Sequence, residues 1–329
     1  MKVTVFSSLV LTALAFSPLL ASGAPTGLVA RGRVSDLRAS SGSARSGNAG
    51  NANGGSVANI ATGESSVRNG AGSTNRAGDG GRSVTGDAIG GNGSSGGSAT
   101  SGNSGNANGG DVINEATGES TVNNQGSNRA GDGGVSRSGD AIGGNSNKKR
   151  SSKIDALLNK YKNFNPPSSG SATSGNSGDT NGGSVANIAQ GESTIRNNGA
   201  NTAGDGGRSV SGDAIGGNGS GSGGGGNARS GNSGDANGGD VINETSGEST
   251  IRNNGNNIAG DGGRSISGDA IGGNGSGGGN AQSGNSGNAN GGSVINSASG
   301  ESSIVNSGTN RAGNGGTSRS GDAIGGNSS

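Results

Sequence analysis

Residues 185–196 decide the fold, and they read Val185-Ala186-Asn187-Ile188-Ala189-Gln190-Gly191-Glu192-Ser193-Thr194-Ile195-Arg196. The alternate positions form one face, consisting of Val185, Asn187, Ala189, Gly191, Ser193 and Ile195, while Gln190, Glu192, Thr194 and Arg196 belong to the other. Alternation with a period of two, together with β-branched residues, is typical of a β-strand, because successive side chains point to opposite faces. The stretch therefore predicts extended structure with two distinct faces.

The same pattern recurs in five internal repeats. The phrase Gly-Asp-Ala-Ile-Gly-Gly-Asn contains Asp87, Asp140, Asp213, Asp269 and Asp322, which are spaced by 53, 73, 56 and 53 residues. Each repeat also contains the sequence Gly-Glu-Ser, at Glu64, Glu119, Glu192, Glu248 and Glu301. A Gly-Asp-Gly-Gly turn follows at Asp79, Asp132, Asp205 and Asp261, with Asn314 in the fifth repeat. Repetition at this period predicts units that are stabilised by packing on their neighbours.

These features predict an all-β repeat fold, a β-solenoid of Gly/Asn/Ser-rich coils with one short helix. Because the repeats contain no Leu and no aromatic residue, the interior must be thin. We expect Val, Ile and Ala to fill it, with stacked Asn and Ser whose amides and hydroxyls bond to the next coil. The alternative is a largely disordered low-complexity chain, because 79 of the 329 residues are Gly and ordering Gly costs backbone entropy.

The composition argues against an enzyme and against a bound cofactor. The chain has no His and no Cys, so it lacks the commonest general base, thiolate nucleophiles and the usual zinc and iron–sulfur ligands. Asp235-Ala236-Asn237 begins like a calcium loop, but Asp240 and Ser246 occupy the positions that need Gly and Glu. We expect no catalytic residue and no metal site.

The amino end predicts a secretory signal peptide over residues 1–24. Lys2 precedes an apolar stretch from Leu9 to Phe16, and small residues at 21–24 follow. A membrane anchor is the alternative, but Pro18 and hydroxyl residues interrupt the run before it could span a bilayer. The remaining divisions are a pro-region or flexible linker at 25–45, repeats 1 and 2 at 46–147, a basic amphipathic insert at 148–168, and repeats 3 to 5 at 169–329. No membrane span is expected in the mature chain.

The insert concentrates positive charge in a chain whose net charge is +1. It contains Asp155 and the basic residues Lys148, Lys149, Arg150, Lys153, Lys160 and Lys162. Ile154, Leu157, Leu158 and Tyr161 stand at helical spacing and predict one apolar stripe, which Pro166 and Pro167 would end. So short a helix is marginal alone, so the stripe needs a partner: the solenoid edge, another protein or a membrane surface.

Three interpretations of Lys148-Lys149-Arg150 remain open. The run has the extended positive charge that nuclear-import receptors and nucleic-acid phosphates bind, so host import machinery and non-specific DNA are expected partners. Paired basic residues in a secreted chain are also cut by kexin-type processing proteases, which would release Ser151 as a new amino end. The third interpretation is a solvated linker. The sequence does not predict an oligomeric state.

Asn-x-Ser/Thr triplets suggest sites of glycosylation during export. They occur at Asn92, Asn218, Asn243, Asn274 and Asn327. Such triplets arise easily by chance in a sequence so rich in Asn, Gly and Ser, so they are a weak sign of surface exposure.

With signal peptide, repeats and Lys148-Lys149-Arg150-Ser151-Ser152-Lys153 together, the chain resembles secreted repeat proteins of filamentous fungi. The stretch from Ala24 to Arg31 looks like the short pro-regions that follow their signal peptides. The basic run makes the chain similar to nuclear-targeted effector proteins of plant-pathogenic ascomycetes. That resemblance implies a non-enzymatic virulence protein, secreted and then directed to the host nucleus, with DNA contact. The alternative is an extracellular or cell-wall structural repeat protein, processed at Lys149-Arg150.

Overall fold

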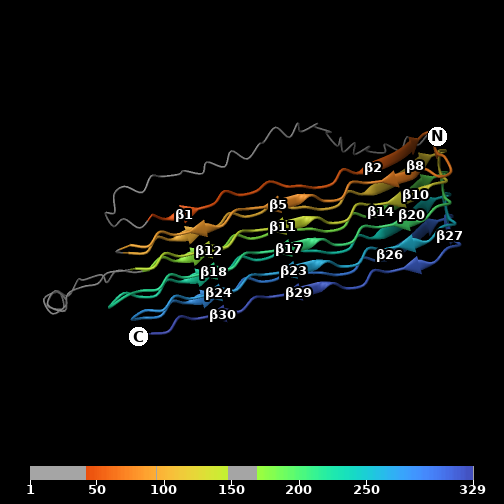
Figure 1. Cartoon of the computed structure of the whole chain (residues 1–329). Helices are drawn as coiled ribbons and strands as arrows, with labels where there is room; N and C mark the ends of the chain where they lie inside the picture. The colour runs from red at the N-terminus through yellow and green to blue at the C-terminus, as the bar shows by residue number, and fades with distance from the viewer. Residues whose placement is uncertain (1–41, 94, 147–168, 329) are drawn as a thin grey trace, which may run out of the picture. The chain divides into compact units, whose positions relative to one another are not determined.

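The computed structural model describes residues 42–93, 95–146 and 169–328, which belong to one compact unit, Ala39–Ser329. These residues form five stacked coils, numbered 1 to 5 and spanning 44–93, 99–146, 172–219, 228–275 and 281–328. Each coil gives one strand to each of six parallel five-stranded sheets (Figure 1). The predicted β-solenoid is confirmed, and the disordered alternative does not hold for these residues. The described ranges contain no helix, and the helix expected in the insert lies outside them.

The first three sheets follow the chain outward through each coil. Sheet 1 consists of β1 (Ala44–Arg45), β7 (Ala99–Thr100), β13 (Ala172–Thr173), β19 (Ala228–Arg229) and β25 (Ala281–Gln282). Sheet 2 consists of β2 (Val57–Thr62), β8 (Val112–Gly118), β14 (Val185–Gly191), β20 (Val241–Gly247) and β26 (Val294–Gly300). Sheet 3 consists of β3 (Ser66–Asn69), β9 (Thr121–Asn124), β15 (Thr194–Asn197), β21 (Thr250–Asn253) and β27 (Ser303–Asn306).

The other three sheets follow the chain on its way back. Sheet 4 consists of β4 (Thr74–Arg76), β10 (Ser127–Arg129), β16 (Asn201–Thr202), β22 (Asn257–Ile258) and β28 (Asn310–Arg311). Sheet 5 consists of β5 (Arg82–Val84), β11 (Val135–Arg137), β17 (Arg208–Val210), β23 (Arg264–Ile266) and β29 (Thr317–Arg319). Sheet 6 consists of β6 (Ala88–Ile89), β12 (Ala141–Ile142), β18 (Ala214–Ile215), β24 (Ala270–Ile271) and β30 (Ala323–Ile324).

The coils stack in one register, so equivalent residues of successive repeats form rows along the stack. In sheet 2, Val185 of β14 pairs with Val112 on one side and with Val241 on the other. The register continues across the insert, since Ala172 of β13 pairs with Ala99 and with Ala228. Neighbouring parallel strands lie about 4.8 Å apart, so each row repeats at about that distance.

The decisive stretch 185–196 forms two strands instead of one. β14 ends at Gly191, whose φ of 82° lies in the left-handed region that favours glycine, and β15 begins at Thr194. The equivalent glycine has a positive φ in every coil, at Gly63, Gly118, Gly191, Gly247 and Gly300. Val185, Asn187, Ala189, Ser193 and Ile195 are buried as a set, while Gly191 is exposed at the turn. The predicted inward face is therefore correct on both sides of a turn that the alternation did not reveal.

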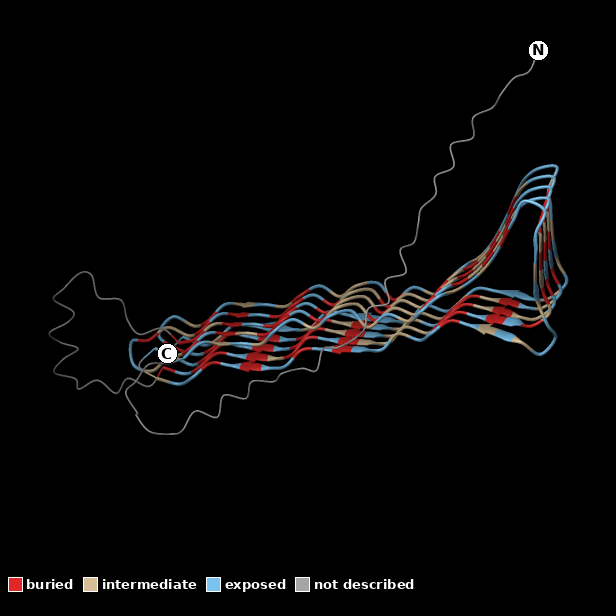
Figure 2. Cartoon of the chain, turned by 90° about the horizontal axis from the view of Figure 1, so that it is seen from above, coloured by how far each residue is buried: buried red, intermediate tan, exposed pale blue. Residues whose placement is uncertain are grey.

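Sheets 2, 3 and 4 form the triangular end of each coil, seen at the right in Figure 2. Its interior holds two apolar clusters: Ile195 and Ile251 pack with Ala189, and Val185 and Val241 pack in the other. Between these clusters lie three rows of Asn, one from each sheet. In sheet 2 the row runs through Asn59, Asn114, Asn187, Asn243 and Asn296, and each Nδ2 donates to the Oδ1 of the next coil at 2.8 Å. The predicted interior of small apolar residues and stacked Asn is confirmed.

The rest of each coil is a thin two-layer arm, made of an outward segment and a return segment (Figure 2). In the outward segment of coil 2, Ser101, Ser104, Ala107 and Gly110 are buried at every third position. A period of three is typical of the polyproline II helix, which has three residues per turn and no internal hydrogen bonds. Its backbone N–H and C=O groups are therefore left to bond with neighbouring segments. Along the arm the strands of sheets 1, 5 and 6 are only two or three residues long.

Hydrogen bonds between glycine backbones connect the two layers of the arm. Gly183 donates to Gly131, Gly204 to Gly183, and Gly239 to Gly204, all at 2.8–2.9 Å, and the same alternation continues through the other coils. Glycine is required by this close approach: a Cβ on Gly182 of the outward segment would clash with the carbonyl oxygen of Gly204 on the return segment. The high glycine content is therefore a packing requirement of the arm.

Candidate functional site

The residues that the sequence singled out in the insert lie outside the described residues. They are the basic group Lys148, Lys149, Arg150, Lys153, Lys160 and Lys162 and the stripe Ile154, Leu157, Leu158 and Tyr161. On either side of the insert the coils are continuous. Gly170 donates its N–H to the carbonyl of Gly144 at 2.9 Å. In the other coils, Gly97, Gly226 and Gly279 make the equivalent bonds at 2.7–2.8 Å across shorter turns. The insert thus connects coil 2 to coil 3 without interrupting the hydrogen bonds of the described residues on either side.

Four of the five suggested glycosylation sites share one row of these turns. Asn92, Asn218, Asn274 and Asn327 are exposed, and the first three accept a backbone N–H from the next coil through Oδ1. Asn243 is different, because it is fully buried and its Nδ2 donates to Asn296 at 2.8 Å. A glycan on Asn243 is incompatible with the folded coil.

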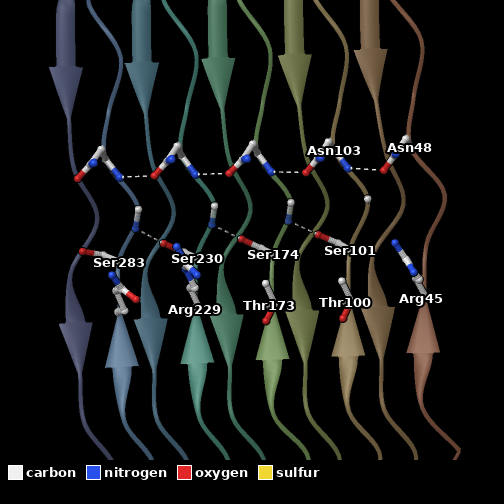
Figure 3. A pocket seen from close by; sticks show the side chains of 18 residues that line it. Arg45, Asn48, Thr100, Ser101, Asn103, Thr173, Ser174, Arg229, Ser230 and Ser283 are labelled. Atoms are coloured by element: carbon white, nitrogen blue, oxygen red, sulfur yellow. Dashed lines mark hydrogen bonds between the residues drawn. The ribbon is translucent and has the colours of Figure 1, made fainter.

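A polar groove of about 460 Å³ crosses all five coils on the outward segment and is a candidate site (Figure 3). One wall is formed by the second residue of each strand of sheet 1. These residues are Arg45, Thr100, Thr173, Arg229 and Gln282. The opposite wall is a row of exposed asparagines, which consists of Asn48, Asn103, Asn176, Asn232 and Asn285. Both walls repeat with the coils.

The floor of the groove is fixed by serines that bond across the two layers. Ser101 donates its hydroxyl to the carbonyl of Gly139 on the return segment at 2.5 Å and accepts the N–H of Gly175 at 2.7 Å. Ser174 and Ser230 repeat this arrangement, donating to Gly212 and Gly268. Because these hydroxyls are already occupied and buried, the floor is rigid and is a poor source of free hydrogen-bonding groups.

In coils 1 to 4 the Oδ1 of each amide in the asparagine wall is used in bonding between coils, and the Nδ2 is left to donate to a ligand. Asn103 Oδ1 accepts the N–H of Asn176, and Asn176 Oδ1 accepts the N–H of Asn232, at 2.8–2.9 Å. These bonds hold the side chains in one orientation, as the dashed lines in Figure 3 show. The exposed amide nitrogens then form a row of donors at about 4.8 Å spacing. The opposite wall adds the hydroxyls of Thr100 and Thr173.

Charge in the groove comes from Arg45 and Arg229, and no acidic residue lines it. Acidic residues lie beside the groove on the outward segment, at Asp179 and Asp235, and on the return segment, where Arg76 pairs with Asp79 at 3.0 Å and Arg129 with Asp132 at 3.3 Å. In the acidic row on the return segment, the backbone N–H of Asn314 is the main cause that holds the pKa of Asp261 below its ordinary value. Partial desolvation opposes this, while the side chain of Asn314 and the charge of Arg311 act with it.

Chemically, the groove can donate hydrogen bonds to an extended polar polymer that lies along the stack. The described ranges contain no group of three or more acidic residues placed to hold a metal ion. They contain no helix, and so no helix long enough to cross a membrane. Sequence reasoning missed this groove. The available signal was the three-residue spacing of Asn103 and Asn106 beside buried Ser and Ala, which predicts a row of outward amides.

No protein-family model, no curated protein and no solved structure was found to match the chain. Functional inference therefore starts from the rows of side chains and from the coil geometry.

Proposed function

We propose that this chain is an extracellular structural repeat protein whose coils form a stiff scaffold that adheres to hydroxyl-rich polymers of a cell wall. The observation that supports it is the uninterrupted hydrogen bonding between coils, which continues from Gly55 through Gly78 and Gly110 to Gly292 and Gly313. Each coil packs on its neighbours through six sheets, so local bending would break many bonds at once.

The polar groove supports the adhesive part of this proposal. A polysaccharide offers hydroxyl and ring oxygens at regular intervals, and the Asn103 row offers amide donors at regular intervals opposite Thr100 and Thr173. Interactions of this kind are individually weak in water, about 1 kcal/mol each, so binding depends on several rows acting together. Arg45 and Arg229 add affinity for an anionic polymer.

A wall-retention assay tests the proposal. The purified secreted chain is incubated with isolated cell walls of the organism that produces it, and the bound fraction is measured after sedimentation. We expect retention, and a several-fold lower retention for the double variant Thr173→Ala, Arg229→Ala, whose side chains line the groove. Arg208→Ala on the return segment is the control, since Arg208 is also exposed and belongs to sheet 5. Equal retention of all three chains would contradict the proposal.

The second candidate function is a secreted effector that the basic insert directs to the host nucleus. The placement of the insert favours it, because the chain leaves coil 2 after Ser146 and re-enters at Ser169 without changing the register of the coils. An insertion at this point leaves the described coils on either side in the same register. DNA contact by the basic residues would be sequence-independent and sensitive to salt.

Two measurements separate the second candidate from the first. Mass spectrometry of the secreted product shows whether Ser151 is a new amino end, which would remove the basic run from the rest of the insert. For an intact chain, a fluorescent fusion of residues 25–329 is expressed in plant cells. Nuclear accumulation that disappears when Lys148, Lys149 and Arg150 are changed to Ala supports the effector function, and unchanged accumulation contradicts it.

A further inference from the structure

Among the described residues, the two end coils of the stack have strand edges that pair with no further strand. All six sheets begin in coil 1 and stop in coil 5, so each sheet has one edge strand at either end. Edge strands present rows of N–H and C=O groups that are ready to pair with another chain. Solenoids usually carry atypical terminal repeats that block this pairing. Within the described ranges, coils 1 and 5 have the same strands as the internal coils.

Apolar side chains at both ends are only partly covered. In the internal coils Val112, Val185 and Val241 are fully buried, but Val57 in coil 1 and Val294 in coil 5 are half-buried. The neighbouring cluster behaves in the same way, with Val67 and Ile304 at its two ends. If coil 5 lay on coil 1 of another molecule, Val294 would cover Val57 and Ile304 would cover Val67, as equivalent residues do within the chain.

The asparagine row of sheet 2 gives the stack a direction. Every Nδ2 in this row donates toward the carboxyl-terminal coil, ending with Asn243 to Asn296. Asn296 Nδ2 therefore donates to no other described residue at one end of the row. At the other end, the Oδ1 of Asn59 accepts no side-chain bond from the described residues. A head-to-tail contact would join this donor to this acceptor, whereas a head-to-head contact would set like groups against each other.

In the arm, too, donors at one end of the stack match acceptors at the other end. Here the donors are backbone N–H groups and the acceptors are side-chain Oδ1 atoms. Within the chain, the N–H groups of Asn103 and Asn106 donate to the Oδ1 atoms of Asn48 and Asn51 in the preceding coil, at 2.9 Å. The equivalent N–H groups of Asn48 and Asn51 have no such acceptor among the described residues. Coil 5 supplies the missing kind of acceptor at its free face, through Asn285 and Asn288.

Two substitutions in coil 5 lower the repulsion that such a contact would create. Asn314 stands in the row of Asp79, so it would face the next copy's Asp79 without a like charge. Val305 stands in the row of Arg68 and pairs with Arg252, so it would separate the next copy's Arg68 from Arg252. Coil 5 thus lacks charge at two places where coil 1 has it.

We propose that the protein assembles head to tail, with coil 5 of one copy stacked on coil 1 of the next in the register used inside the chain. The contact is heterologous and continues the linear stacking of the coils, so it produces an open filament that grows by whole molecules instead of a closed ring. This inference rests on the end coils alone and is independent of the proposed function and of the polar groove.

Sedimentation velocity of the full secreted chain over a wide concentration range tests the assembly. We expect the mass to rise with concentration in whole multiples of the monomer, without a plateau. Asn296→Asp is the decisive variant, because its carboxylate still accepts from Asn243 and Asn306 but presents an acceptor to the next copy's Asn59. We expect its dissociation constant to rise by about tenfold or more.

Asn290→Asp is the matched control, with the same charge change in the same coil. Asn290 lies in a row where Oδ1 only accepts a backbone N–H, as Asn237 does from Asn290, so a carboxylate serves equally well there. We expect it to assemble like the natural chain. A monomer at every concentration would overturn the proposal, whether or not another segment covers coil 1. So would a dimer that stops growing, or an equal loss of assembly in Asn290→Asp.

Discussion

The triangular end and the two-layer arm belong to the same coils but are packed in different ways. At the triangular end, side chains such as Ile195 and Asn187 fill a space between three sheets. In the arm, the backbones of glycines such as Gly183 and Gly204 touch directly and bond to each other at 2.8 Å. We therefore expect the removal of one methyl group from the triangular end to cost less stability than the addition of one methyl group to the arm. Both regions are held in register by the same stacking of coils.

The largest effect is expected from adding one methyl group to the arm. In Gly206→Ala the new Cβ would lie 2.1 Å from the carbonyl oxygen of Ala236, which accepts the N–H of Gly263. Because both contacts are backbone, relief requires the layers to separate, and we expect a loss of about 3 kcal/mol or more in the free energy of unfolding. Urea unfolding followed by circular dichroism measures it. Gly86→Ala, which has nothing within 4 Å of its Cβ, should be nearly neutral.

The next effect comes from breaking a buried row of amides. Asn187 accepts from Asn114 and Asn197 at 2.8 and 2.9 Å and donates to Asn243 at 2.8 Å, and it is fully buried. Asn187→Ala leaves those partners without bonds, so we expect a loss of about 2 kcal/mol. The exposed bond from Asn254 to Asn198 is the comparison, and Asn254→Ala should change the urea midpoint little. Equal effects in the two variants would mean that burial of the row contributes nothing.

Removing one methyl group from the triangular end should cost less than adding one to the arm. Ile195 is fully buried among Val122, Ala189 and Ile251. Ile195→Val removes one carbon and leaves a small cavity, which typically costs about 1 kcal/mol. The control is Ile215→Val, because Ile215 is 39% exposed. If Ile195→Val proved as damaging as Gly206→Ala in the same urea titration, the contrast between the two regions would be wrong.

The smallest effect concerns acid. The pKa of Asp261 is lowered in the folded chain, so this carboxylate stabilises the fold above the ordinary value of 3.8. The contribution is lost as the pH falls through the lower folded pKa, because the unfolded chain then takes up the proton more readily. We expect Asp261→Asn to flatten the dependence of the urea midpoint between about pH 5 and about pH 2. A dependence as steep as that of the natural chain would show that Asp261 does not contribute.

The sequence predicted the triangular end better than the arm. Alternation over 185–196 identified the inward face of sheets 2 and 3, and the lack of large apolar residues pointed to stacked Asn. The turn at Gly191 was missed because the period of two continues through it. The arm was missed because Ser101, Ser104 and Ala107 follow a period of three, which a strand pattern does not register.

The candidate sites divide in the same way. The groove depends on Thr173 and Asn176 aligning with their counterparts in four other coils, and this alignment becomes visible only once the coils are stacked. A row of exposed isoleucines on the outer face of sheet 6 likewise becomes visible only once the coils are stacked. It comes from the Ile of the repeated phrase, at Ile89, Ile142, Ile215, Ile271 and Ile324. The basic insert, the signal peptide and the localisation they imply stay predictions.

Amide hydrogen exchange of the purified chain tests the central claim most directly, namely that the glycine arm is as ordered as the strands. The N–H groups of Gly183, Gly204 and Gly239 bond between layers, and those of Asn187 and Ile195 lie in sheets 2 and 3. We predict that the protection of the three glycines lies within about tenfold of that of the two strand residues. Exchange of the glycines at the rate of an unstructured chain, beside protected strands, would contradict the account.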